Sequence, residues 1–427
     1  MKSLAALLTV ALLLTPARSA ARCAPDNGGL TLPAGFCASV FADNLGQARH
    51  LAVAVDGTVY VNTWRSPYRE GAKVAPGGFL VALRDADGDG VAELVERFGE
   101  DSSGRATGGT GIAIHKGQLY AEESGRIVRY ALVLGKLVPR GERDIVVDNL
   151  PTKGGHTMHP FVISRDGALF INVGSASNAC QVKDRAPHSP GRQPCEELDE
   201  RAGLWRYDAS LPAQLFERGG RYATGLRNAV ALAMHPSAGL VVLQHGRDQL
   251  HENWPEKFSL QQGAELPAEA MFRIKYGADY GWPYCYYDGR EDRHVLAPEY
   301  GGDGRETGRC RGLPAPVAAY PAHWAPNALL FYTGSAFPER YRGGAFIAFH
   351  GSWNRPQQQG YNLVFQPLDR DGAPSGGFEV FADGFAGPVR TPEGARHRPS
   401  GVAMGPDGAL YVSDDQRGRV WRIVPGK

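Results

Sequence analysis

The sequence predicts an all-β fold, a six-bladed β-propeller of four-stranded antiparallel blades, and two observations support this prediction. First, two short apolar segments joined by a turn recur six times along the 427 residues, which is typical of propellers. Second, no segment of twelve or more residues between these repeats has the periodicity of an amphipathic helix. The repeats occupy residues 51–63, 111–123, 161–174, 230–244, 328–350 and 401–414.

Each repeat is interpreted as the inner hairpin of one blade. Asp-Gly pairs at positions 56–57, 166–167 and 407–408 separate β-rich runs, and this dipeptide favours a tight hairpin turn. The runs are continuously apolar, which predicts strands that are buried on both faces. A sandwich array or two separate β-domains would not require hairpins that are so evenly spaced. Candidate outer strands follow four of the hairpins, at residues 78–84, 127–134, 204–209 and 361–369.

The N-terminal part of the chain is predicted to close the ring. Residues 36–46 precede the first hairpin and have the composition of a strand, so we expect them to supply the outer strand of the last blade. No low-complexity linker divides the chain. We therefore predict one propeller domain over residues 22–427.

Composition and the first residues indicate an exported protein. Apolar residues make up 43% of the chain, which excludes intrinsic disorder, and 46 basic against 45 acidic residues exclude a typical nucleic-acid-binding protein. Lys2 precedes an apolar run that is too short to cross about 30 Å of hydrocarbon, and small residues follow, so residues 1–21 are predicted to be a signal peptide. No later segment is apolar enough for a membrane span. We expect a periplasmic or secreted protein.

The cysteines agree with export. Six cysteines can pair in 15 ways, but their clustering favours three sequential pairs, each stabilising the fold by about 3 kcal/mol. No Cys-x-x-Cys or Cys-x-x-Cys-His motif occurs, which argues against zinc, thioredoxin-type chemistry and an attached c-type haem. The predicted pairs are Cys23 with Cys37, Cys180 with Cys195, and Cys285 with Cys310.

Several short motifs occur in polar, irregular stretches between the hairpins. They are Leu-Arg-Asn at 226–228, Gly246, Tyr-Gly-Trp-Pro at 280–283, Ala-Pro at 325–326, a block over 337–355 ending in His-Gly-Ser-Trp-Asn-Arg, and Arg-Pro at 398–399. In this order they resemble the glucose/sorbosone dehydrogenase family, six-bladed propellers that use pyrroloquinoline quinone (PQQ). The resemblance runs from about residue 30 to the C-terminus and is nearer to the sorbosone branch than to the soluble glucose branch.

The resemblance implies a catalytic base. Oxidation of a sugar hydroxyl or a hydrated aldehyde requires removal of the O–H proton while hydride leaves the carbon, and a neutral histidine suits that role. His156 stands where the family's base is expected, and His159 is the competing candidate. The structural alternative for either residue is a loop histidine bonded to the backbone.

The resemblance also implies the residues that bind the cofactor. Arg227 and Asn228 match the pair that contacts the quinone oxygens, where a cation and an amide stabilise developing negative charge. Arg355 and Arg398 would bind carboxylates of PQQ through their planar donor groups. Aromatic residues 282, 284, 286 and 287 form either a wall of this pocket or the packing around Cys285.

Two calcium sites are predicted. The resemblance implies Ca²⁺ on main-chain carbonyls of Gly246 and Arg247, although His245 and Arg247 depart from the family pattern at this point. Independently, residues 85–96 match the pattern of a twelve-residue Ca²⁺ loop, but strands rather than helices are predicted on either side, so a polar hairpin turn is the alternative. The expected ligands of this loop are Asp85, Asp87, Asp89 and Glu96.

The leading hypothesis is an exported oxidoreductase, dependent on PQQ and Ca²⁺, that oxidises an aldose or a sugar-derived aldehyde by hydride transfer to the quinone. Because no haem motif is present, electrons would leave to a separate acceptor, a soluble cytochrome or a quinone. Two alternatives stay open. A Ca²⁺-dependent propeller lactonase would use carboxylates that converge on a channel metal. A non-catalytic binding propeller that has lost the cofactor would be favoured if Arg227 and Arg398 point apart.

Overall fold

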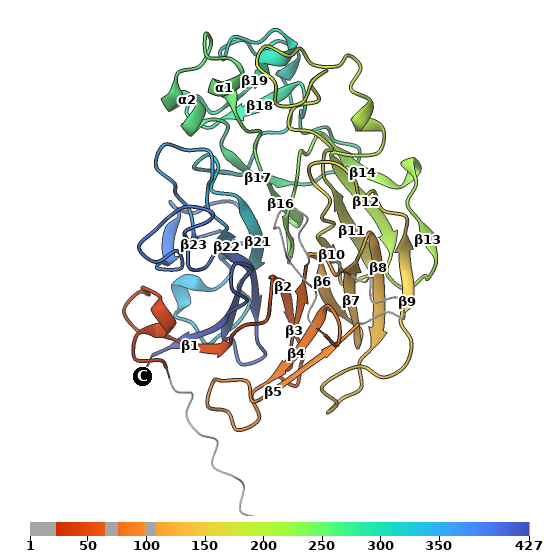
Figure 1. Cartoon of the computed structure of the whole chain (residues 1–427), viewed down its shortest axis with the longest axis vertical. Helices are drawn as coiled ribbons and strands as arrows, with labels where there is room; N and C mark the ends of the chain where they lie inside the picture. The colour runs from red at the N-terminus through yellow and green to blue at the C-terminus, as the bar shows by residue number, and fades with distance from the viewer. Residues whose placement is uncertain (1–22, 65–75, 100–106, 427) are drawn as a thin grey trace, which may run out of the picture.

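The protein, described by a computed structural model over residues 23–64, 76–99 and 107–426, consists mainly of β-sheets arranged around a channel (Figure 1). The first blade contains β2 (Ala48–Val53), β3 (Val59–Thr63), β4 (Leu80–Arg84) and β5 (Leu94–Phe98). The second contains β6 (Ile112–His115), β7 (Gln118–Glu123), β8 (Arg126–Ala131) and β9 (Asp144–Asp148), extended by the short parallel strand β13 (Gln214–Leu215). The third contains β10 (Phe161–Ile163), β11 (Ala168–Val173), β12 (Gly203–Asp208) and β14 (Arg221–Thr224).

The other three blades repeat this arrangement. The fourth contains β15 (Ala231–His235), β16 (Gly239–Gln244), β17 (Glu269–Arg273) and β20 (Ala318–Tyr320). The fifth contains β21 (Pro326–Phe331), β22 (Ala345–Phe349), β23 (Asn362–Gln366) and β24 (Glu379–Ala382). The sixth contains β25 (Pro399–Met404), β26 (Leu410–Asp414), β27 (Val420–Pro425) and, from the N-terminus, β1 (Phe36–Ala42).

The six-bladed propeller predicted from the sequence is confirmed. The innermost strands contact one another in the order β2, β6, β10, β15, β21, β25, and β25 returns to β2. All six predicted hairpins are the first two strands of a blade. As predicted, β1 pairs antiparallel with β27, with Phe36 opposite Pro425, and so joins the N-terminal strand to the C-terminal blade.

The predicted burial of the hairpins holds for the second strand of each pair and only in part for the first. Strands β3 and β11 are buried along their whole length, whereas β6 and β10 are partly exposed because they line the channel. Away from the loops that carry the site, the channel wall is apolar and encloses a cavity of about 400 Å³. The segments predicted as outer strands are the third strands of their blades. In the first blade β5, the strand predicted after the acidic loop, lies outside β4 and is largely exposed.

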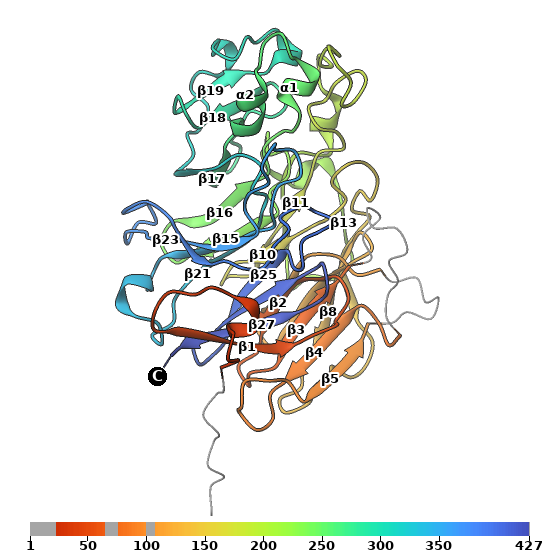
Figure 2. The same ribbon diagram turned by 60° about the vertical axis from the view of Figure 1, so that its left-hand side comes forward.

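Two segments, one between β16 and β17 and one between β17 and β20, form an insertion that projects beyond the fourth blade at one end of the molecule (Figures 1 and 2). It contains α1 (Leu250–Asn253), α2 (Leu260–Glu265), β18 (Cys285–Asp288) and β19 (Arg293–Leu296), which pack around Phe258 and Tyr286. The 3₁₀ turns are η1 (Asn27–Gly29), η2 (Glu196–Asp199), η3 (Arg218–Gly220), η4 (Pro298–Tyr300), η5 (Gly308–Cys310) and η6 (Glu339–Tyr341).

The three predicted disulfides are present, linking Cys23 to Cys37, Cys180 to Cys195 and Cys285 to Cys310. Over the described ranges, no helix has the length and apolar character needed to cross a bilayer. The predicted signal peptide, residues 1–21, lies outside the described residues.

Candidate active site at one end of the channel

Most of the predicted site residues meet at one end of the channel, which we call the channel mouth. It is the end at which the innermost strands begin and the second strands finish. His156 lies before β10, Arg227 and Asn228 lie before β15, Gly246 follows β16, and Arg398 lies before β25. The antiparallel hairpins place all of these positions at the same end, although they are far apart in sequence.

His156 has the orientation expected of a base. Its Nδ1 is 2.8 Å from the carbonyl oxygen of Ser175 and 3.0 Å from the hydroxyl of the same residue. Because a carbonyl only accepts, Nδ1 carries the proton and Nε2 carries the lone pair. Burial, and then the charge of Arg227, lowers the pKa of His156 well below its ordinary value, so the ring is neutral at physiological pH.

His159, the competing candidate, has a structural environment. Its ring is fully buried, and its Nδ1 lies 3.1 Å from Oε1 of Glu122. The backbone N–H of His159 donates to the same oxygen at 2.8 Å, while Glu122 Oε2 accepts from the N–H groups of Thr110 and Gly111. His159 and Glu122 therefore hold the neighbouring loops together, whereas the hydrogen bonds of His156 involve only its Nδ1.

Arg227 is held in one orientation by four acceptors. Its Nε and Nη2 donate to the carbonyl and side-chain oxygens of Asn178 at 3.1 and 3.0 Å, and Nη2 also contacts Asp248 at 2.9 Å. Its Nη1 donates to the carbonyl of Gly246 at 2.8 Å. The carboxylate stays ionised because the charges of Arg227 and Arg185 hold the pKa of Asp248 below its usual range despite burial, which alone would raise it.

Asn228 and His156 both lie close to the backbone of Gly174. Oδ1 of Asn228 accepts from Asn172 at 3.2 Å, which leaves Nδ2 as a donor without a partner among the described residues. Gly174 separates Asn228 from His156, since a Cβ there would lie 2.9 Å from Asn228 Oδ1 and 2.6 Å from His156 Cβ. Only glycine permits this close approach of base and amide.

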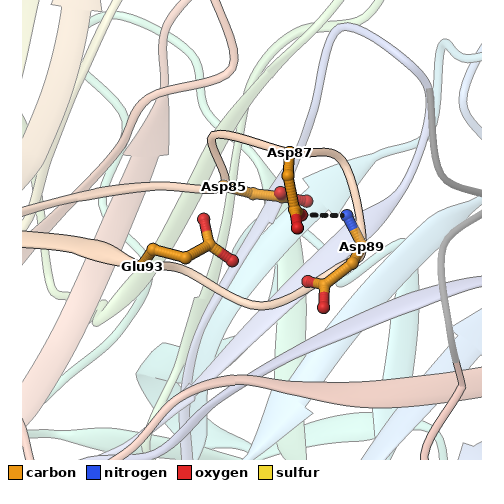
Figure 3. Close-up of side chains that lie close together, drawn as sticks. All are labelled: Asp85, Asp87, Asp89 and Glu93. Carbon is orange, nitrogen blue, oxygen red and sulfur yellow. Dashed lines mark hydrogen bonds between the residues drawn. The ribbon is translucent and has the colours of Figure 1, made fainter. Parts of the chain in front are cut away.

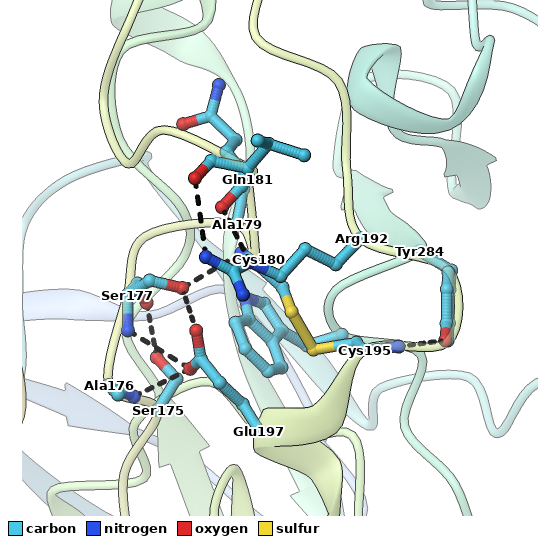
Figure 4. The surroundings of a disulfide bond; sticks show 12 residues. Ser175, Ala176, Ser177, Ala179, Cys180, Gln181, Arg192, Cys195, Glu197 and Tyr284 are labelled. Atoms are coloured by element: carbon cyan, nitrogen blue, oxygen red, sulfur yellow. Dashed lines mark hydrogen bonds between the residues drawn. A yellow bond between two sulfur atoms is a disulfide. The ribbon is translucent and has the colours of Figure 1, made fainter.

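Segment 175–178, of which Figure 4 labels Ser175, Ala176 and Ser177, contacts both His156 and Arg227. Ser175 binds His156, and Asn178 binds Arg227. Glu197, on η2, accepts from the backbone N–H groups of Ala176 and Ser177 at 2.8 and 3.1 Å and from the Ser177 hydroxyl. Cys180 follows this segment by two residues, and Cys195 precedes Glu197 by two residues. The Cys180–Cys195 disulfide therefore fastens the end of the segment to the start of η2.

Arg398 reaches the mouth from the sixth blade. Its Nε and Nη2 donate to the carbonyls of His350 and Gly351 at 3.2 and 2.9 Å. Next to it, His350 Nε2 lies 2.8 Å from Oδ1 of Asp415, and Arg49 pairs with the other oxygen of Asp415. Arg227 and Arg398 thus stand at the same end of the channel rather than at opposite ends.

Arg355 does not join this group. Its Nη1 donates to the carbonyls of Ala264, on α2, and Ala322. The guanidinium therefore fastens its loop to the insertion, and this orientation argues against the carboxylate-binding role predicted from the sequence. The preceding residue, Asn354, reaches the mouth instead, with Nδ2 2.9 Å from Asp248 Oδ1.

The charge of Arg247, next to Gly246, is compensated. Its Nη1 lies 2.6 and 2.5 Å from the two carboxylate oxygens of Glu299, and both side chains are buried in the insertion. The Gly246 carbonyl accepts from Arg227 but has a second lone pair. The two main-chain oxygens predicted to bind Ca²⁺ at residues 246 and 247 are fewer than the 6–8 oxygens that Ca²⁺ takes. A bound ligand must supply others.

The aromatic side chains near Cys285 pack around the disulfide and also face the channel mouth. Trp282 is buried and donates from Nε1 to the Asn178 carbonyl at 3.0 Å, while Tyr286 and Tyr287 are also buried. Tyr284 packs against both neighbouring disulfides. Trp282 thus supports segment 175–178. Together with Tyr286 and Tyr287 it also lines a small cavity whose other walls include Arg227 and Gly246.

The acidic loop after β4 differs from its prediction in one residue. Carboxylate oxygens of Asp85, Asp87, Asp89 and Glu93 lie within 4.8 Å of one another (Figure 3). The prediction that Glu96 completes the set is wrong, because β5 begins at Leu94 and Glu96 pairs with Ala82 across the sheet. Position twelve of the pattern therefore lies in the sheet, and Glu93, which precedes β5, is the carboxylate nearest to the three aspartates.

The predicted binding of Ca²⁺ by this loop can be tested by differential scanning calorimetry. Ca²⁺ at a hundredfold excess over its Kd is expected to stabilise the protein by about 2.7 kcal/mol. Glu93→Gln is expected to remove most of this gain, and Glu96→Gln, the matched control, to retain it. An equal gain in all three proteins would show that Ca²⁺ acts elsewhere.

The chain was compared with known proteins. A family model described as TrAA12-like matches residues 30–425. The chain belongs to this family. A protein of Borreliella burgdorferi described as uncharacterized is 28% identical over 202 residues, which are 47% of this chain and 48% of that protein. The match thus spans about half the length of that relative.

Solved structures share the propeller of this TrAA12-like protein. The calcium structure of the Trichoderma reesei family AA12 enzyme has a TM-score of 0.72 at 18% identity, covering 96% of this chain and 99% of that one. The holo form of the pyranose dehydrogenase PQQ domain from Coprinopsis cinerea has a TM-score of 0.71 at 19% identity, covering 95% and 98%. PQQ-bound aldose sugar dehydrogenase from Streptomyces coelicolor has a TM-score of 0.53 at 19% identity, covering 92% and 99%. These likenesses establish the fold and do not single out a sorbosone branch.

The donors at the channel mouth fit PQQ, a tricarboxylate with a quinone. Among the described residues, Nε2 of His156, Nδ2 of Asn228 and Nη1 of Arg398 are polar atoms at the mouth that have no hydrogen-bond partner. They supply a base, a neutral donor and a cation. This combination suits a ligand that carries negative charge and a polar ring.

Sequence reasoning missed four residues that shape the mouth. Asn178 and Asp248 orient Arg227, and Asp415 pairs with Arg49. Two of them could have been found from their positions in the chain, because Asp248 follows Gly246 by two residues and Asp415 directly follows the sixth hairpin. Asn178 and Arg49 lie outside the recognised motifs, and only the fold brings them here.

Proposed function

We propose that the protein is an exported, PQQ-dependent oxidoreductase that oxidises an aldose or a sugar-derived aldehyde. The observation that carries this proposal is the state of His156. Its Nδ1 is committed to the Ser175 carbonyl, its Nε2 keeps a lone pair, and its lowered pKa keeps the ring neutral. A neutral imidazole fixed beside two donors is the arrangement required to remove a proton from a substrate hydroxyl.

Each residue at the mouth has a definite part in this proposal. His156 Nε2 accepts the hydroxyl proton, and Arg227 and Asn228 stabilise negative charge that develops on an oxygen next to them. Arg398 binds a carboxylate with Nη1. When bound, PQQ supplies the quinone that accepts the hydride. Fixed hydrogen bonds to Asn178 and Asp248 keep Arg227 from moving as charge develops, so little reorganisation is needed.

The main-chain oxygens of Gly246 and Arg247 are proposed to hold Ca²⁺ together with the cofactor. Because the protein offers few oxygens here, cation binding at this position is expected to be weak unless PQQ is present. The two electrons leave to a separate acceptor, a soluble cytochrome or a quinone. Three disulfides agree with a periplasmic or secreted protein.

The alternative functions receive less support. A lactonase needs carboxylates that are free to bind a channel metal, but Asp248 is engaged by Arg227 and Arg185, and Asp415 by Arg49. A binding propeller without cofactor does not need Arg227 and Arg398 at one end of the channel.

The test is a titration of purified, metal-stripped protein with PQQ, with and without Ca²⁺, followed by absorbance and by sugar-dependent dye reduction. We expect saturable, Ca²⁺-dependent binding and turnover. Arg398→Ala is expected to weaken PQQ binding about tenfold, since a charge-assisted hydrogen bond is lost, while the exposed Arg396→Ala, in the same loop, leaves it unchanged. Absence of PQQ binding to the unaltered protein would overturn the proposal.

A further inference from the structure

A groove lies between the third and fourth blades, at the end of the molecule opposite the channel mouth. Its volume is about 660 Å³, within the range of about 300–1,000 Å³ that is usual for ligand sites. Its walls come from the β10–β11 turn, from β12 and β14, and from the segment after β17. These parts of the blades are remote from His156 and Arg227. The groove, which we call the far-end groove, is therefore separate from the proposed active site.

One wall of the far-end groove is aromatic and fixed in position. Tyr276 is 78% exposed, yet its main chain is held, because the N–H of Gly277 donates to the carbonyl of Tyr222 at 2.8 Å. The rings of Tyr276 and Tyr222 have centroids 5.5 Å apart, and Tyr222 packs edge-on against the buried Phe170 at 4.9 Å. An exposed ring that is held in this way loses little conformational freedom when a ligand packs on it.

Charged side chains line the groove beside these rings. Asp166, in the β10–β11 turn, accepts from the Ser164 hydroxyl with Oδ1, which lowers the pKa of the carboxyl group and leaves Oδ2 without a partner among the described residues. Arg206, on β12, is exposed, and no ion pair joins it to a described carboxylate. The guanidinium of Arg221 lies over the ring of Trp205, 5.1 Å from its centroid. The groove thus combines a carboxylate acceptor with two guanidinium donors.

This combination of groups indicates the chemical class of the ligand. A wholly apolar molecule would remove water from three charged groups and replace none of its hydrogen bonds. A phosphate or another strongly anionic ligand would suit the two arginines but would lie next to the carboxylate of Asp166. A neutral sugar ring satisfies every group, because its C–H face packs on an aromatic ring while its hydroxyl groups donate to a carboxylate and accept from guanidinium groups.

The angle between the two tyrosine rings indicates the shape of the ligand. The rings of Tyr222 and Tyr276 are inclined to one another by 54°. A flat, ribbon-like chain of sugars presents parallel ring faces, so it cannot pack on two surfaces with this inclination. A helical chain turns each sugar relative to the next, and its consecutive rings can therefore pack on both tyrosines.

We propose that the far-end groove binds a neutral, helically coiled oligosaccharide of the α-1,4-linked glucan type, at a site that takes no part in the oxidation. Two consecutive sugars pack on Tyr222 and Tyr276, and Asp166 and Arg206 bind their hydroxyl groups. Binding at this end leaves the channel mouth free, so the protein can stay attached to a polysaccharide during turnover. The site does not depend on PQQ.

The experiment is isothermal titration calorimetry of the protein without PQQ and again with PQQ and Ca²⁺ present. Maltopentaitol, an α-1,4-linked chain whose reducing end has been converted to an alcohol, is the probe, and cellopentaitol, its β-1,4-linked counterpart, is the comparison. We expect saturable binding of maltopentaitol with the same affinity in both forms of the protein, and binding of cellopentaitol that is about tenfold weaker because one stacking contact is lost.

Variants locate the binding. Tyr276→Ala is expected to weaken maltopentaitol binding about tenfold, and Tyr276→Phe, which keeps the ring, to retain most of the affinity. Asp166→Asn should also weaken binding, since a charged acceptor becomes a neutral one. Both side chains are exposed, so the melting temperature should not change. Trp353→Ala is the matched control, because it removes an indole that is 50% exposed on the loop after β22, at the mouth, and it should leave the affinity unchanged.

The inference is overturned by absence of maltopentaitol binding, by equal binding of cellopentaitol, or by unchanged binding in Tyr276→Ala. Loss of binding in Trp353→Ala would also overturn it, by placing the chain at the mouth. Failure of the proposed function is distinguishable, because absence of PQQ binding is read by absorbance while the calorimetric titration is still carried out on the cofactor-free protein.

Discussion

Replacing His156 with asparagine is expected to lower kcat by about 10²- to 10⁴-fold and to leave PQQ affinity nearly unchanged. Asparagine can still direct an N–H toward the Ser175 carbonyl, as Nδ1 of the histidine does, so the loop keeps its hydrogen bond. It has no basic atom in place of Nε2. The variant therefore removes the proton acceptor and little else, and steady-state dye reduction with a PQQ titration measures both quantities.

The pH dependence of kcat in the unaltered enzyme is a second test of the proposal that His156 accepts the proton. The folded protein lowers the pKa of His156, so the base is still neutral at pH 6.5, where a free histidine is half protonated. We expect kcat to stay level as pH falls through 6.5 and to decrease only at lower pH. His115→Asn, at the other end of β6, is the control and should match the unaltered protein. Full activity in His156→Asn would show that another group takes the proton.

The fold was predictable because the propeller repeats one short-range pattern. Each inner hairpin combines two apolar runs with a turn, and six such hairpins require a ring whose last sheet is completed by residues 36–46. Apart from β1 and β5, the outermost strands were not predicted. Strand β20, for example, has three residues, which are too few to show the periodicity that marks a strand.

The site was predictable where its residues lie in recognisable motifs and not where it depends on side-chain direction. His156, Arg227 and Asn228 meet as expected. Arg355 lies in the most specific motif of the resemblance and nevertheless turns to the carbonyls of Ala264 and Ala322. Neighbours in the insertion decide that direction, and a linear sequence does not reveal which carbonyls lie within reach.

Replacing Glu197 with alanine is expected to lower kcat about 10²-fold although this residue lies outside the predicted site. Glu197 holds the N–H groups of Ala176 and Ser177, and this segment carries the carbonyl that fixes His156 and the amide that fixes Arg227. Loss of these charge-assisted hydrogen bonds lets the segment move, and a displacement of about 1 Å at a reacting group can cost about 10²-fold in rate. Glu197 is thus a positioning residue, and kcat with a thermal unfolding curve tests it.

The pH profile separates positioning of the base from a general loss of stability. If segment 175–178 loosens in Glu197→Ala, water reaches the imidazole, the burial that lowers its pKa is relieved, and the acid limb of kcat moves to higher pH. Glu197→Gln keeps an oxygen for the two N–H groups and should recover most of the rate. Glu196→Ala, an exposed neighbour on the same turn η2, should change neither quantity. A lower melting temperature with an unchanged acid limb would mean that Glu197 stabilises the fold without orienting His156.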